Sequence, residues 1–166
     1  MNYLQLILLS LISLVVLTSY YFYLFKGSTS DYFTHPFWFG ISPSIVKILM
    51  VFQVFAVIGF ITTIISWIIN PPKQGIMYGN NLFYTLILFF VSATIWPIAT
   101  QYKIHWLVIS SLILTAIASI LMLVGTIEER KEDIKTYKVL GMIFLCMVSV
   151  LVDGVLWNVN YIKQIS

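Results

Sequence analysis

The stretch VLGMIFLCMVSVLVDGVLWNVNY, residues 139–161, is long enough to cross a lipid bilayer as one helix, since about 20 apolar residues span the hydrocarbon core. One formal charge, Asp153, lies well inside it. At helical spacing Ser149, Asp153 and Trp157 fall on one face, and Asn160 follows along the same helix. A carboxyl near the centre of a membrane helix costs roughly 2.5–3.5 kcal/mol on translocon scales. We therefore expect the face that carries Asp153 to point toward other helices and away from lipid.

Composition extends this interpretation to the whole chain. Of its 166 residues, 60% are hydrophobic and only 9% are charged, whereas soluble domains carry about 25% charged residues. The mean hydropathy is +0.98. No soluble fold of this length could bury so much apolar surface, so we expect lipid to cover it. The formal net charge of +3 comes from few charges, mostly at segment ends. Nucleic-acid binding needs a concentrated basic face, so we expect no nucleic-acid partner.

Long apolar runs recur along the chain, separated by linkers that contain proline, glycine or charge. The predicted spans are residues 4–25, 44–69, 81–100, 104–124 and 139–161. Asn70-Pro71-Pro72 ends the second, because neither proline can donate to a continuing helix. The tight connection at 101–103 makes the third and fourth spans antiparallel neighbours. The sequence thus predicts an all-α, polytopic membrane helix bundle of five transmembrane helices with short connections, one domain over residues 1–166. Five spans would place the termini on opposite sides of the membrane.

Local signals predict where two of these helices begin and end. Ser42 followed by Pro43 suits a helix start, with a capping hydroxyl and then proline at the first helical position. Gly125 suits the position just after the fourth span, and Thr126 with Glu129 matches a capping box that opens a new helical turn. We therefore expect the fourth helix to stop before a separate polar segment.

Ser111, Thr115 and Ser119 recur at four-residue spacing in the fourth span, which puts small side chains on one stripe of the helix. Small residues at this spacing let membrane helices approach closely. The stripe predicts that this side of the helix packs against another helix.

Other polar side chains lie isolated inside the spans. They are Gln53, Ser149, Asp153, Trp157 and Asn160. In one interpretation they hydrogen-bond across helices and hold the bundle together, each contributing about 0.6 kcal/mol. In the other they line a polar cavity for a small ligand, ion or proton, with Asp153 as its charged element.

No spacing typical of a catalytic or metal site accompanies these residues. His35 and His105 lie in or beside different linkers, without an H-x-x-H, H-E-x-x-H or Cys/His pattern. The single Cys146 cannot form an intrachain disulfide. Asp153 has no second carboxylate inside any span with which to share acid–base chemistry. We therefore expect a non-catalytic protein with no metal and no cofactor.

Two classes of function stay open. The first is a structural or assembly subunit of a larger membrane complex or virion membrane, whose partners are the lipid bilayer and other membrane protein subunits or further copies of the chain. The second is a small carrier, channel or ligand-binding membrane protein built on the polar face around Asp153. The basic residues divide between the two predicted sides, with Lys73, Arg130, Lys131, Lys135 and Lys138 on one and Lys26, Lys47, Lys103 and Lys163 on the other. The cluster at 130–138 favours the first side as cytoplasmic or matrix.

Overall fold

The computed structural model describes residues 3–22, 38–129 and 136–165. These residues form helices and linkers and contain no strand. Within them, five helices are long and apolar enough to cross a membrane, so the predicted helical membrane bundle is confirmed. They are α1 (Tyr3–Tyr20), α2 (Pro43–Ile69), α3 (Asn80–Gln101), α4 (His105–Glu129) and a last helix made of α5 (Thr136–Met147), η4 (Val148–Trp157) and α6 (Asn158–Ile165).

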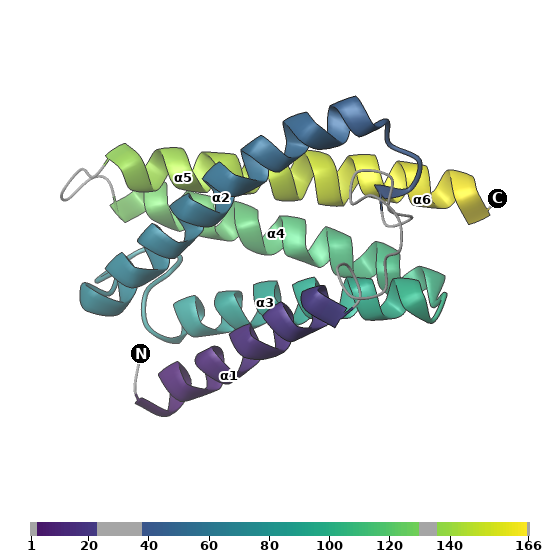
Figure 1. Cartoon of the computed structure of the whole chain (residues 1–166). Helices are drawn as coiled ribbons and strands as arrows, with labels where there is room; N and C mark the ends of the chain where they lie inside the picture. The colour runs from purple at the N-terminus through teal and green to yellow at the C-terminus, as the bar shows by residue number, and fades with distance from the viewer. Residues whose placement is uncertain (1–2, 23–37, 130–135, 166) are drawn as a thin grey trace.

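Successive helices run in alternating directions, so the N-terminal and C-terminal ends lie at opposite ends of the bundle (Figure 1). The helix α4 lies in the middle, with α3 packed on one side and α5 and η4 on the other. The outer helices are α1, which packs on α3, and α2, which packs on α5. A side-chain contact also joins α2 to α3, because the rings of Phe60 and Phe89 lie 5.1 Å apart.

The two ends of the bundle carry the predicted sets of charges. Lys73 and Lys138 lie at the end where α2 and α4 finish, and Lys47, Lys103 and Lys163 lie at the other. Several predicted features lie outside the described residues. They are residues 23–25 of the first span, Lys26, His35, Arg130, Lys131 and Lys135.

The closest approach of two helices is between α2 and α5, at Gly59 and Gly141. A Cβ atom built on either glycine would overlap the backbone of the other. Backbones approach this closely only where both residues lack a side chain. Thr63, fully buried one turn later, donates its hydroxyl to the Gly59 carbonyl at 2.9 Å. This glycine pair therefore fixes the crossing point of α2 on the last helix.

The predicted end of the fourth helix is wrong. The helix α4 continues through Gly125 and Thr126 to Glu129, so Gly125 is no C-terminal cap and Thr126 opens no new helix. Thr126 is buried, and its hydroxyl donates to the Met122 carbonyl at 2.8 Å within the same helix. Gly125 instead leaves room for the side chain of Met77, which packs directly on it. Tertiary packing has extended the helix past its local stop signal.

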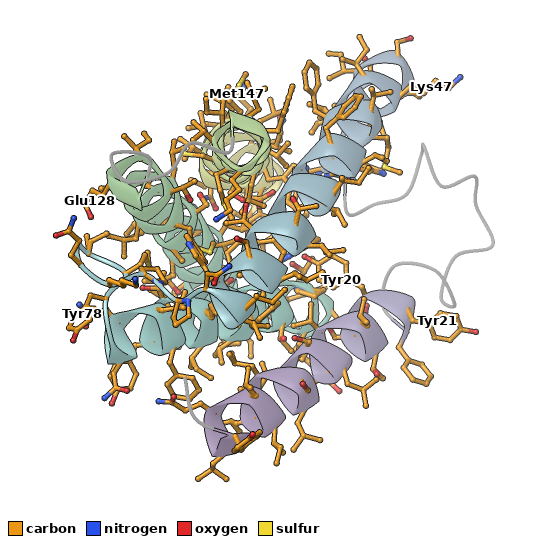
Figure 2. All side chains as sticks on the ribbon, turned by 90° about the vertical axis from the view of Figure 1, so that its left-hand side faces the viewer. Tyr20, Tyr21, Lys47, Tyr78, Glu128 and Met147 are labelled. Carbon is orange, nitrogen blue, oxygen red and sulfur yellow. The ribbon has the colours of Figure 1, made fainter. Side chains whose placement is uncertain are left out.

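The linker 71–79 folds over the end of α4. Gly75 has a φ of +83°, a conformation that favours glycine, and the next amide, of Ile76, donates to the Glu128 carboxylate at 2.7 Å. Figure 2 views the bundle from this end and shows Tyr78 and Glu128 where the linker meets α4. The linker thereby closes this end of the bundle.

The other predicted helix boundaries agree with the structure within a few residues. Pro43 begins α2 with Ser42 as its N-cap, although the Ser42 hydroxyl makes no capping hydrogen bond. The helix α2 ends at Ile69, just before the prolines. A turn at 102–104 joins α3 to α4, and these two helices pack antiparallel along their length. Its residue Lys103 has a φ of +55°.

Candidate functional site

The hydroxyl stripe of α4 lies at the centre of the bundle. Ser111, Thr115 and Ser119 are all buried. Thr115 donates to the Ser92 hydroxyl of α3 at 2.9 Å, and Ser119 lies beside the Cys146 side chain of α5. The stripe therefore contacts both of the helices that flank α4, as helix packing through small residues requires.

The segment that carries Asp153 is π-helical, from Val148 to Trp157. A π-helix bonds i to i+5, so its turn is wider than that of an α-helix, but residues four apart still lie close to one line. Ser149 and Trp157 are buried, whereas Asp153 between them is only half-buried. Asp153 therefore lies nearer the edge of the packed surface than Ser149 and Trp157. Ten residues make an unusually long π-helix, since most are single-turn bulges and these often occur at functional sites.

The Asp153 carboxyl makes no hydrogen bond or ion pair with any residue that the structure describes. Trp157, four residues later on the last helix, has a buried indole N–H that is also unpaired among these residues. Gln53 is half-buried on α2, six residues before Gly59 of the glycine crossing, and Asp153 lies twelve residues after Gly141 on the last helix. At 1.5 Å per residue they are about 9 Å apart along the bundle.

The remaining sequence-predicted candidate is Asn160, which is half-buried on α6 and has no hydrogen-bond partner in the described part of the chain. The structure therefore does not bring Gln53, Asp153 and Asn160 together into one polar cavity.

An aromatic cluster surrounds Trp157, which sequence reasoning listed only as a neighbour of Asp153. The Trp157 ring lies 4.7 Å from that of Trp96 on α3, 5.6 Å from Trp38 and 6.4 Å from Phe39. Trp96 in turn donates its indole N–H to the Tyr20 hydroxyl of α1 at 2.9 Å. These rings join α1, α3 and the last helix at one end of the bundle. Only their spatial arrangement shows this, because Tyr20, the Trp38–Phe39 pair, Trp96 and Trp157 are far apart in sequence.

Two neighbouring buried polar atoms beside this cluster are unpaired. They are the Trp157 indole nitrogen and the Asn158 side-chain oxygen, which have no hydrogen-bond partner among the described residues. The Asn158 amide nitrogen does donate to the Gly154 carbonyl at 3.1 Å. Most buried polar atoms in proteins are hydrogen-bonded, so an unpaired donor and acceptor in consecutive residues mark this turn as unusual. Sequence reasoning did not single out Asn158.

His105, at the start of α4, pairs with the last helix. Its Nδ1 lies 2.7 Å from the Tyr161 hydroxyl. Within the described residues, no three His, Cys, Asp or Glu side chains lie close enough to hold a metal ion. No protein-family model, curated protein or solved structure matches the chain.

Proposed function

We propose that the chain is a multi-pass integral membrane protein that serves as a non-catalytic subunit of a larger membrane assembly. It contacts its partner through the side of the last helix that carries Asp153. The observation that supports this is a carboxyl in the middle of an apolar helix, half-buried, with no hydrogen-bonding partner among the described residues of its own chain.

The cost of this carboxyl favours a partner. A carboxyl at mid-helix costs roughly 2.5–3.5 kcal/mol in lipid, and it has no donor among the described residues of its own chain. A hydroxyl, amide or basic side chain from an adjacent subunit would supply that donor. Leu151 and Val155, two residues before and after Asp153, are more than half exposed, but residues two apart lie on different faces of a helix, so they do not share the Asp153 surface. An unpaired acid in an otherwise apolar helix suits a specific contact with another membrane helix.

Native mass spectrometry of the full chain, extracted in a mild detergent, tests this proposal. We expect a complex of fixed stoichiometry. The variant Asp153→Leu should dissociate this complex, whereas the control variant Leu151→Ala, two residues earlier on the same helix, should not. The same Asp153→Leu change should leave the isolated chain at least as stable, because it removes an unpaired carboxyl. A monomeric wild type, or a Leu variant that stays in the complex, would contradict the subunit role.

A second candidate function is supported by a different observation. In the turn after Asp153, the Trp157 indole N–H and the Asn158 side-chain oxygen are buried and have no partner in the part of the chain that the structure describes. A carboxyl, a donor and an acceptor within six residues suit a small ligand or cation, so the chain is alternatively a carrier or ligand-binding membrane protein. In that case Asp153→Asn abolishes ion flux or ligand binding in proteoliposomes while the oligomeric state is unchanged. A silent Asp153→Asn variant in that assay removes this alternative.

A further inference from the structure

A groove of about 320 Å³ runs along the outer surface between α3 and α4. It is lined by Tyr84, Leu88, Val91 and Ile95 from α3 and by Leu107 and Leu114 from α4. Tyr84, Val91 and Leu114 are exposed, so the groove opens sideways, toward the space that lipid fills around a membrane bundle.

The chemistry of the lining selects an apolar occupant. Three serines also line the groove, but each hydroxyl already donates to a carbonyl of its own helix. These bonds are Ser92 to Leu88 at 2.7 Å, Ser110 to Leu107 at 3.3 Å and Ser111 to Val108 at 2.9 Å. With these donors used, little remains to orient a polar ligand. A hydrocarbon chain fills such a groove without leaving a polar group unpaired.

The length of the groove matches one leaflet of a bilayer. Its α3 wall extends from Tyr84 to Ile95, about 16 Å at 1.5 Å per residue. The hydrocarbon core is about 30 Å thick, so one leaflet supplies about 15 Å. The wall is centred on α3 and therefore crosses the middle of the span, so an acyl chain that enters from the 102–104 end lies along it past the midplane.

The turn at 102–104 lies at one end of the groove and carries a cation. Leu107, in the groove wall, is one turn of helix from Lys103. Tyr102 and Trp106 beside it are 68% and 70% exposed, as is typical of aromatic residues at the lipid headgroups. Lys103 is exposed and forms no ion pair with any described residue. The described acidic residues, Glu128, Glu129 and Asp153, do not lie at this end.

The backbone at Lys103 supports a role for its side chain. Its φ of +55° lies in the left-handed region, where glycine or asparagine is accommodated at lower cost than lysine. A lysine in such a position is an outlier from which a functional hypothesis can start.

We propose that this groove binds one phospholipid, with an acyl chain between α3 and α4 and an anionic headgroup on Lys103. The site rests on the membrane location proposed above and not on the subunit role. The observations that carry it are the apolar lining with its internally bonded serines, the long α3 wall and the cation at the 102–104 end.

The headgroup half of this proposal is tested with the full chain in nanodiscs that contain equal amounts of phosphatidylglycerol and phosphatidylcholine. After mild detergent extraction, native mass spectrometry counts the retained lipids. We expect phosphatidylglycerol to be preferred, and Lys103→Asn to reduce this preference about five-fold, from the contribution of one lysine near an anionic surface. Asparagine tolerates the left-handed turn. The matched control, Lys73→Asn at the opposite end, should leave the preference unchanged.

The acyl half is tested by filling the groove. Val91→Phe should lower the retention of both lipids, whereas Ile113→Phe, an equally exposed position of α4 outside the groove, should not. Soluble glycerol phosphate should not displace the lipid. Equal retention of the two lipids by the wild type, equal effects of the paired variants, or displacement by glycerol phosphate would overturn the lipid site. A chain that fails to enter nanodiscs counts instead against the membrane location.

Discussion

Replacing Gly59 by alanine tests the crossing of α2 and α5 and should destabilise the bundle by about 2 kcal/mol. The new Cβ would lie 2.6 Å from the Gly141 carbonyl carbon and 2.8 Å from its oxygen, where ordinary contacts are about 3.5–4.0 Å. Backbone atoms cannot rotate aside as a side chain can. The two helices must therefore separate by about 1 Å, which also loosens the stacking of Phe55 on Phe144 at 5.5 Å.

The magnitude follows from two opposing terms. Overpacking costs about 1–3 kcal/mol, and a clash between backbones belongs at the upper end of that range. The greater helix preference of alanine returns about 0.5–1 kcal/mol. The net loss of about 2 kcal/mol corresponds to a change of about thirty-fold in the unfolding constant.

Titration of the folded protein in mild detergent with SDS, followed by tryptophan fluorescence, measures this loss. Trp67 is buried in α2 and reports on the outer helix directly. Gly154→Ala is the control, because its Cβ would meet only the Ala116 side chain at 3.2 Å and the Ser149 carbonyl at 3.4 Å. We expect the control to change stability by no more than about 0.5 kcal/mol. If Gly59→Ala were no more destabilising than Gly154→Ala, the close crossing would be refuted.

Two further substitutions test the interior of the bundle by the same SDS titration. Thr115→Leu should lower the free energy of unfolding by about 2 kcal/mol, because it overpacks the α3–α4 contact and leaves Ser92 without its donor. The control Thr18→Leu, on the exposed side of α1, should have little effect. Equal effects of the two variants would mean that the α4 stripe does not mediate packing. Tyr20→Phe removes the acceptor of the Trp96 indole N–H and should lower the free energy of unfolding by about 1–3 kcal/mol. The control Tyr21→Phe, at an exposed position, should leave stability unchanged. An unchanged stability of Tyr20→Phe would show that the bundle does not need this hydrogen bond.

The span pattern could be predicted from sequence because it depends on local properties. A run of about 20 apolar residues must cross a bilayer as a helix, since backbone polar groups have no other partner there. Prolines 71 and 72 end α2 wherever it packs. Gly125 shows the limit of such signals, because Met77, forty-eight residues earlier in the chain, packs on it and α4 continues.

The details of the site depend on features that the 3.6-residue periodicity of an α-helix cannot predict. The last helix is π-helical from Val148 to Trp157, and nothing in the local sequence fixes that wider turn. The pairing of Gly59 with Gly141 joins residues eighty-two positions apart, so neither glycine stands out alone. The position of Trp157 among three other rings likewise depends on the assembled bundle.

The two proposed contact surfaces lie on opposite sides of α4. Leu107 lines the lipid groove, and Ala116, nine residues later, faces Gly154 next to Asp153. At about 100° per residue, nine residues amount to two and a half turns, which places these two side chains about 180° apart. Effects at sites with no shared partner add within about 0.5 kcal/mol. In the double variant Lys103→Asn, Asp153→Leu, the lipid preference should therefore fall as far as in Lys103→Asn alone. Partner binding should fall as far as in Asp153→Leu alone. A double variant whose lipid preference depended on Asp153 would show that α4 transmits a change between the two surfaces.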